Sequence, residues 1–300
     1  MTTALPGSVG PSEATIQREF PGSNEALRAG LHEGQIYLLA PTAASLELAD
    51  EAHRLLVAAV GENPRAVHER HTNEEIFARI GQLRRTLYLE PRFHEAVRTA
   101  IAALGFDPKR CAFDPLRLRV ILHRGHEIPA ARAVYYPHRD TWYAHPQSMI
   151  AWWVPLDDLT DEETFVFFPE RFRSPVGNDS EIFDYDEWVR RGWSLKIGWQ
   201  DARSGAEARY PAATEPAPPG GLGFSCQKGQ NLLFSGSHYH RTLPQFAGKT
   251  RFSLDFRLVH LDDEEGHHGA PNVDNRSRGS CLADYVGFAK DAGHKGTDRG

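Results

Sequence analysis

Apolar residues near the N-terminal end of the chain recur at the three- and four-residue spacing of an amphipathic helix. A short apolar run at residues 35–39 is typical of a strand, and Thr42 after it is a good helix N-cap. The helical periodicity continues over residues 44–60 as far as Gly61, a residue type that commonly ends helices. The pattern therefore predicts a strand followed by a long helix.

Two further helices are expected directly downstream. Thr72 and Glu75 have the spacing of a capping box, which predicts a helix over residues 73–89. Pro91 suits the first turn of another helix, because proline lacks the amide hydrogen that stays unpaired at that position. We therefore expect residues 30–106 to form a mostly helical unit.

After Asp107 the pattern changes to short apolar runs separated by Pro, Gly and Asp. These runs predict strands at residues 116–122, 133–138, 149–156, 164–169, 229–240 and 251–259. Neither a strand–helix alternation nor a glycine-rich phosphate loop accompanies them. We therefore expect an α+β fold, in which residues 107–260 form a jelly-roll or cupin-like barrel buttressed by the N-terminal helices.

Three segments lack the pattern of regular elements. Residues 1–20 are rich in Pro, Gly, Ser and Thr, and we expect them to form a flexible arm. Residues 170–228 form a long polar insertion in the barrel, and insertions of this kind are commonly lids or binding loops. Residues 261–300 are again polar and loop-like. The expected organisation is one domain over residues 1–300, with the insertion as its lid.

Composition excludes several classes of function. The chain is 40% hydrophobic and has a formal net charge of −6 without any basic run, so a nucleic-acid partner is not expected. Cys111, Cys226 and Cys281 lie far apart, which indicates reduced thiols rather than a disulfide framework. The N-terminal residues do not resemble a secretion signal, and no apolar run reaches the roughly 18 residues of a membrane helix. We expect a soluble cytoplasmic protein with no membrane partner.

The segment YYPHRDTWYAHP contains His138 and Asp140 two positions apart at the end of a predicted strand. Side chains at that spacing in a strand share one face, so an imidazole and a carboxylate should point together into the barrel. The later segment FSGSHYH supplies His238 and His240. Two imidazoles and one carboxylate form the facial triad of non-haem iron(II) oxygenases, which leaves metal positions open. We choose His240 because it ends the predicted strand, and His238 is the alternative.

The next predicted strand carries a candidate site for a carboxylate. Arg251 and Ser253 share one face of it, and a guanidinium fork with a hydroxyl group is suited to binding a carboxylate. Arg257 lies on the same face and is the alternative arginine. Gln147 either donates a hydrogen bond to the same carboxylate ligand or is a structural amide. His145 either contacts a metal-ligating residue or the substrate, or is an ordinary loop histidine.

The pattern H-x-D…H…R-x-S in a strand-rich C-terminal half resembles the iron(II)/2-oxoglutarate-dependent dioxygenase superfamily, particularly its phytanoyl-CoA-hydroxylase-like branch. The resemblance covers roughly residues 115–260. It implies a double-stranded β-helix in which iron(II) is held by His138, Asp140 and His240, and 2-oxoglutarate by Arg251 and Ser253. In the family, O₂-dependent decarboxylation of 2-oxoglutarate is coupled to oxidation of a substrate. The carboxylate of Asp140 implies hydroxylation rather than halogenation, because halogenating relatives have a small residue there.

The resemblance implies a small or medium-sized metabolite as substrate, in specialised-metabolite biosynthesis, with hydroxylation, desaturation or epimerisation as the outcome. Two alternatives stay open. A cupin-like isomerase or dioxygenase that does not use 2-oxoglutarate would keep the metal triad and have no use for Arg251. A non-catalytic barrel that binds small ligands would need neither. The substrate and the oligomeric state are left open by the sequence.

Overall fold

The computed structural model describes residues 15–190 and 210–288. In it, three N-terminal helices begin at the residues that the local sequence signals predicted. These helices are α2 (Ala43–Val60), α3 (Asn73–Leu89) and α4 (Pro91–Ala103). The Thr42 side chain caps α2, and both hydrogen bonds of the capping box between Thr72 and Glu75 open α3. The helical expectation for this part of the chain is confirmed, because caps and periodicity are local properties of the sequence.

The strands form a mainly antiparallel sheet of seven strands and a second sheet of two. The main sheet runs in the order β1-β2-β7-β5-β9-β3, with β4 also paired to β9. Its strands are β1 (Ile16–Gln17), β2 (Ile36–Leu39), β3 (Cys111–Phe113), β4 (Arg117–Ile121), β5 (Ile150–Pro155), β7 (Asn231–Ser235) and β9 (Arg251–His260). The second sheet pairs β6 (Phe165–Phe167) with β8 (His240–Thr242). The α+β expectation is therefore confirmed.

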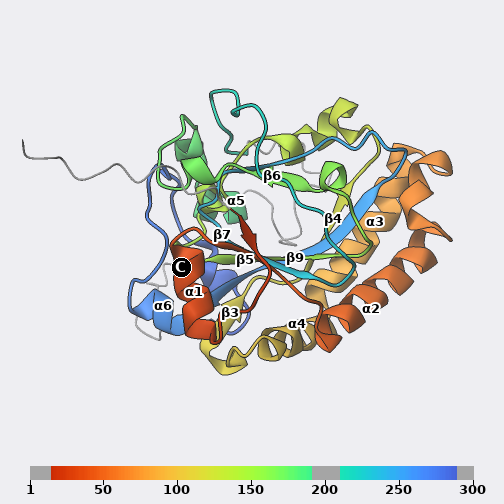
Figure 1. Cartoon of the computed structure of the whole chain (residues 1–300). Coiled ribbons are helices and arrows are strands. Elements are labelled where there is room, and N and C mark those ends of the chain that lie inside the picture. The colour runs from red at the N-terminus through yellow and green to blue at the C-terminus, as the bar shows by residue number, and fades with distance from the viewer. Residues whose placement is uncertain (1–14, 191–209, 289–300) are drawn as a thin grey trace, which may run out of the picture.

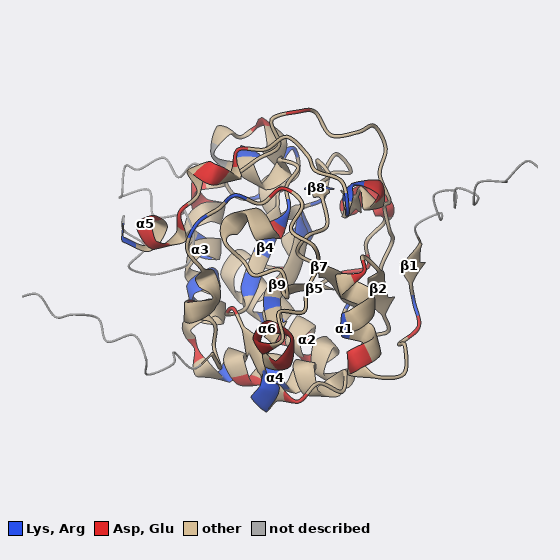
Figure 2. Ribbon diagram, turned by 90° about the vertical axis from the view of Figure 1, so that its left-hand side faces the viewer, with Lys and Arg blue, Asp and Glu red and all other residues tan. Residues whose placement is uncertain are grey.

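Helices α2, α3 and α4 gather on one side of the main sheet (Figure 1), and the two faces of β9 are correspondingly different. Phe252, Leu254 and Phe256 belong to the core that the sheet shares with these helices. The alternating residues between them are polar, and they face away from the helices. Figure 2 shows basic positions along the strands near the centre of the molecule. One strand thus supplies both the hydrophobic core and a polar wall.

Two strand predictions around the candidate site were wrong. Residues 133–138 do not form a strand, because a 3₁₀ segment (Pro129–Tyr135) with proline in its first turn occupies the first half of that run. The predicted strand over 229–240 is two strands: β7 ends at Ser235, and the amide of His238 bonds to the Ser235 carbonyl in a turn. His240 therefore begins β8 instead of ending the strand, because Ser and Gly in the turn interrupt the extended run.

The remaining helical elements have nine residues or fewer, and the longest of them, α1, was not predicted from the sequence. These elements are α1 (Asn24–His32), α5 (Tyr185–Arg190), α6 (Leu261–Glu265) and 3₁₀ segments at Pro64–Glu69, Pro108–Arg110, Gly125–Glu127, Asp140–Tyr143, Asp161–Glu163, Pro169–Arg171, Ser180–Ile182 and Cys281–Asp284. None of the helices in the described part of the chain has the length and apolar character needed to span a membrane. The predicted arm and lid fall partly on residues 1–14 and 191–209, which lie outside the described residues.

A buried polar network joins the start of α2 to the main sheet. Asn231 on β7 accepts a hydrogen bond from the indole of Trp152 at 3.0 Å. Its amide nitrogen donates to the carbonyl of Ala40 at 3.1 Å and to Ser45 Oγ at 3.2 Å. Because Trp152 and Ser45 are buried, removing the Asn231 side chain leaves their polar atoms with fewer hydrogen-bond partners.

We expect Asn231→Ala to lower the free energy of unfolding by about 1–3 kcal/mol, the cost of leaving buried polar atoms unpaired. The matched control is Asn272→Ala, because Asn272 is exposed and makes only local hydrogen bonds to Asn275, so its loss should cost less than about 0.5 kcal/mol. Urea unfolding followed by circular dichroism measures both. Equal effects of the two substitutions would show that the network does not stabilise the fold.

Candidate functional site

His138 and His240 are joined by two backbone hydrogen bonds. The amide of each donates to the carbonyl of the other at 3.0 Å, which forms an isolated antiparallel bridge. Their ring centroids lie 4.4 Å apart. Asp140 follows at the start of a 3₁₀ turn, with its carboxylate 3.7 Å from His138 Nε2. Ligand atoms of all three side chains lie within 4.8 Å of one another, a spacing that could hold one metal ion.

Hydrogen bonds to backbone carbonyls determine which ring nitrogen of each histidine faces this group. His138 Nδ1 lies 2.8 Å from the carbonyl of Tyr136, and His240 Nδ1 lies 2.9 Å from the carbonyl of His238. A carbonyl only accepts hydrogen bonds, so each Nδ1 carries the proton and each Nε2 has a free lone pair. Metal-ligating histidines typically have such a partner, since it fixes the tautomer and the ring orientation.

The electrostatics around the triad keep it ready to bind a cation. Burial alone would raise the pKa of Asp140, but Arg257, 3.6 Å away, and the two histidines bring it well below its usual value. Burial and the charge of His138 lower the pKa of His240 to about 4. At neutral pH the site therefore has an ionised carboxylate and an unprotonated His240 imidazole, the forms that ligate metals.

A cavity of about 280 Å³ opens beside the triad. His138, Asp140 and His240 are all among its lining residues. The predicted insertion contributes four aromatic side chains to the walls: Phe183, Tyr185, Trp188 and Tyr210. Helix α3 and strands β4 and β9 contribute arginines. The arrangement suits a ligand with an apolar body and anionic groups.

Arg251 lies on the cavity wall with little compensation for its charge. It is 3% exposed, and in the described part of the chain it has no carboxylate partner. Among the described residues its Nε has no hydrogen-bond partner, and its Nη1 donates a long hydrogen bond of 3.4 Å to the carbonyl of Glu163. Burial lowers the pKa of Arg251 to about 10. A buried guanidinium in this state is suited to receive an anion.

The other predicted carboxylate-binding residues have different positions. Ser253 Oγ is buried without a hydrogen-bond partner among the described residues, although Ser253 does not line the cavity. Arg257 lines the cavity, but it is paired with Asp114 at 3.1 Å. Gln147 does not line the cavity, and its side chain accepts a hydrogen bond from Ser237 at 2.8 Å. The structural alternative for Gln147 therefore fits its contacts, and its assignment to the co-substrate does not.

His238 does not share the face of His240, contrary to the strand alternation expected for the two residues. Its ring packs against Phe167 and Phe172, with centroids 5.5 and 4.6 Å apart, and it does not line the cavity. Burial lowers the pKa of His238 to about 3. The turn before β8 removes the alternation, because residues in a turn do not follow the two-residue period of a strand.

The segment that carries His138 and Asp140 is held by a buried ion pair that the sequence did not predict. Arg139, between His138 and Asp140, is 1% exposed and its Nε donates to Asp274 at 3.0 Å. Asp274 also accepts from the indole of Trp142 at 2.8 Å and from the amide of Val176 at 2.9 Å. No local signal could have identified Asp274, because it lies in a polar stretch expected to be a tail.

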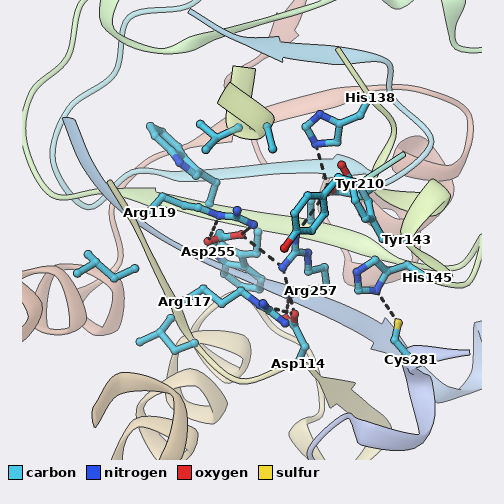
Figure 3. Close-up of a pocket in the computed structure, with 18 of the residues that line it drawn as sticks. Asp114, Arg117, Arg119, His138, Tyr143, His145, Tyr210, Asp255, Arg257 and Cys281 are labelled. Carbon is cyan, nitrogen blue, oxygen red and sulfur yellow. Dashed lines mark hydrogen bonds and ion pairs between the residues drawn. The ribbon is translucent and has the colours of Figure 1, made fainter. Parts of the chain in front are cut away.

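More of the expected tail lines the cavity. Cys281 Sγ lies 2.7 Å from Nδ1 of His145, and the hydroxyl of Tyr285 lies 2.8 Å from the same nitrogen. His145, Cys281 and Tyr285 all line the cavity. Figure 3 shows His145 and Cys281 beside Arg257, on the wall below His138. Cys281, Asp284 and Tyr285 of the expected tail are thus part of the cavity wall.

No protein-family model matches the sequence, and no curated protein matches it either. Among solved structures, EvdO2 from Micromonospora carbonacea var. aurantiaca is 14% identical over 81% of this chain and 94% of that chain, with a TM-score of 0.47. Its complex with 2-oxoglutarate is 16% identical over 58% of this chain and 62% of that chain, with a TM-score of 0.36.

A third structure, SnoN, a non-haem alpha-ketoglutarate-dependent epimerase from nogalamycin biosynthesis, is 17% identical over 87% of this chain and 98% of that chain, with a TM-score of 0.40. The matched region of the EvdO2 complex is less than two thirds of that chain. Because these identities are below 25% and the TM-scores below 0.5, we draw no conclusion about the reaction from the similarities.

We expect Asp274→Ala to lower the free energy of unfolding by about 3–5 kcal/mol, since it leaves Arg139 buried and unpaired. It should also weaken metal binding by the triad, because Arg139 lies between two of its members. The control is Glu181→Ala, which removes an ion pair to Arg276 whose side chains are both more than half exposed and should cost less than about 1 kcal/mol.

Urea unfolding and a titration with manganese(II) measure the two effects. If Asp274→Ala were as mild as Glu181→Ala in both measurements, the ion pair would have no part in positioning the triad.

Proposed function

We propose that this protein is an iron(II)- and 2-oxoglutarate-dependent oxygenase, a jelly-roll or cupin-like enzyme that hydroxylates a small or medium-sized metabolite. The observation that carries the proposal is the convergence of two imidazoles and one carboxylate on the wall of a cavity. Imidazole and carboxylate together suit iron(II) in a site with open positions. Desaturation or epimerisation would use the same site.

The three residues fit the metal that the proposal requires. His138 and His240 would ligate through Nε2, since their Nδ1 atoms donate to carbonyls, and Asp140 would supply a carboxylate oxygen. When bound, iron(II) with 2-oxoglutarate and O₂ supplies the oxidising chemistry. Asp140 favours hydroxylation over halogenation, because its carboxylate occupies the place that a halide would need.

Arg251 supports 2-oxoglutarate as the co-substrate. Its buried guanidinium has no carboxylate partner in the described part of the chain, and a dicarboxylate that is held at the triad by one end could pair with it by the other. A cupin-like enzyme without 2-oxoglutarate would leave this charge buried and uncompensated. The unpaired state of Arg251 therefore favours the 2-oxoglutarate-dependent alternative.

The walls contribute by excluding water and holding the substrate. Phe183, Trp188 and Tyr210 of the insertion line the cavity together with Tyr143. Tyr143 is held in place by a hydrogen bond from its hydroxyl to the carbonyl of Pro211 at 3.2 Å, and its ring packs edge-on against His138. A dry, aromatic site protects a reactive oxidant from side reactions with solvent.

His240→Ala should abolish binding of iron(II), because it removes one of three ligands. His238→Ala should retain it, since the group that orients His240 is the backbone carbonyl of His238, which the substitution keeps. Anaerobic titration of the apoprotein with iron(II) measures both affinities, with about one ion per chain expected in the wild type. The reverse order of effects would assign the ligand to His238.

Arg251→Gln should raise the 2-oxoglutarate concentration needed for half-saturation by about thirtyfold or more, which corresponds to roughly 2 kcal/mol for the loss of a buried charge pair. Iron(II) affinity should stay unchanged. The measurement is 2-oxoglutarate binding by calorimetry to the iron-loaded protein under nitrogen. If Arg257→Gln weakened binding while Arg251→Gln did not, the co-substrate would lie at the other arginine.

A further inference from the structure

The arginines of the cavity outnumber the carboxylates available to pair with them. Among the described lining residues there are five arginines: Arg84, Arg117, Arg119, Arg251 and Arg257. Asp255 makes two hydrogen bonds of 2.9 Å with Arg119 and also lies 3.6 Å from Arg257. Asp114 pairs with Arg117 at 3.0 Å and with Arg257 at 3.1 Å. Asp140 also lies 3.6 Å from Arg257. These three carboxylates pair with Arg117, Arg119 and Arg257, and Figure 3 shows the chain of ion pairs that joins Arg119, Asp255, Arg257, Asp114 and Arg117.

Two arginines are left without a carboxylate in the described part of the chain. One is Arg251, which the proposed function assigns to 2-oxoglutarate. The other is Arg84 on α3, whose Nε donates to the carbonyl of Leu118 at 2.9 Å. This bond fixes the guanidinium plane against β4 and leaves its two terminal nitrogens available for a ligand. Two uncompensated guanidinium groups indicate two anionic ligands.

Arg119 repels Arg84, and the carboxylate of Asp255 offsets only part of this repulsion. Burial and the positive charge of Arg119 lower the pKa of Arg84 to about 10. Arg119 donates to Asp255 through Nε and Nη2, so its Nη1 has no hydrogen-bond partner among the described residues and could donate to a ligand. An anion placed between the two would accept from both arginines and remove their repulsion.

These arginines lie on the more exposed wall of the cavity. The side chain of Arg119 is 41% exposed and that of Arg117 is 30% exposed, whereas that of Asp140 is 9% exposed. Arg84 is half-buried. The cavity therefore has a cationic outer wall and a metal-binding triad in its interior. A substrate with an anionic end would enter with its other end directed towards the triad.

We propose that Arg84 and Arg119 bind an anionic oxygen group, a carboxylate or a phosphate, of the substrate that the enzyme oxidises. The inference rests on the proposed function for the chemistry at the triad, and it adds the chemical class of the substrate. The oxidised carbon then lies away from the anionic group, because the two ends of the substrate are held on different walls. Planar forks of this kind favour carboxylate and phosphate over neutral amides.

The test uses three small aromatic probes that suit the aromatic walls: phenyl phosphate, benzoate and the neutral benzamide. Binding of each is measured by calorimetry under nitrogen to the protein loaded with iron(II) and saturating 2-oxoglutarate, so that Arg251 is occupied. The variants are Arg84→Gln, Arg84→Lys and the control Arg85→Gln. Arg85 is the next residue of α3 and does not line the cavity, so its substitution removes the same charge outside the site.

We expect at least one of the two anions to bind wild type and Arg85→Gln at least tenfold more tightly than benzamide. In Arg84→Gln that preference should disappear, with benzamide binding unchanged, and Arg84→Lys should retain part of it. A preference for phenyl phosphate or for benzoate identifies the anionic group. Unchanged benzamide binding and a normal melting curve exclude misfolding as the cause.

Equal binding of anions and benzamide to wild type would overturn the inference, and so would full anion binding by Arg84→Gln. Failure of the proposed function gives a different result: 2-oxoglutarate would bind Arg251→Gln as well as wild type. Anion binding is therefore also measured in Arg251→Gln. An anion affinity that depends on Arg84 and is unaffected by Arg251→Gln supports an anion site at Arg84 and Arg119, whatever the outcome for 2-oxoglutarate.

Discussion

The two backbone hydrogen bonds between His138 and His240 are the interaction on which the site depends. They bring together residues that are far apart in the sequence and set the imidazoles side by side. Asp140 completes the group because a turn, and not a strand, follows His138. The buried pair of Arg139 and Asp274 then anchors the same segment to the C-terminal residues. Side chains on loops reach metal-binding geometry only when the backbone beneath them is fixed.

Charge balance is the second constraint, and it connects the triad to the rest of the cavity. Arg257 lies between Asp114, Asp140 and Asp255, whose charges raise its pKa far above the usual value against the effect of burial. It keeps Asp140 ionised without being free for a ligand itself. Among the described residues that line the cavity, Arg84 and Arg251 are the arginines without a carboxylate in an ion pair. The unequal distribution of carboxylates thus distinguishes Arg257, which is surrounded by acids, from Arg84 and Arg251, for which we propose anionic ligands.

Strand β9 explains why a site with so much charge can exist inside a folded protein. Its alternate residues Phe252, Leu254 and Phe256 pack into the core under the helices. This burial stabilises a strand whose other face carries Arg251 and Arg257. Since the two faces are independent, the polar face can hold the charge of Arg251, for which we propose a carboxylate ligand.

The sequence by itself determined the features with local causes. The caps at Thr42 and Thr72 fixed where helices start, and alternation along 251–259 separated core from site, because both depend on neighbours within a few residues. It also indicated His138 and Asp140, and it preferred His240 over His238 because His240 was expected to end a strand, whereas in the structure His240 begins β8. The tertiary structure alone decided that His240 and not His238 faces Asp140, since a turn between β7 and β8 interrupts the strand alternation. It alone brought Asp274 to Arg139 and Arg84 to the cavity wall, because contacts between distant chain segments form only when the chain folds.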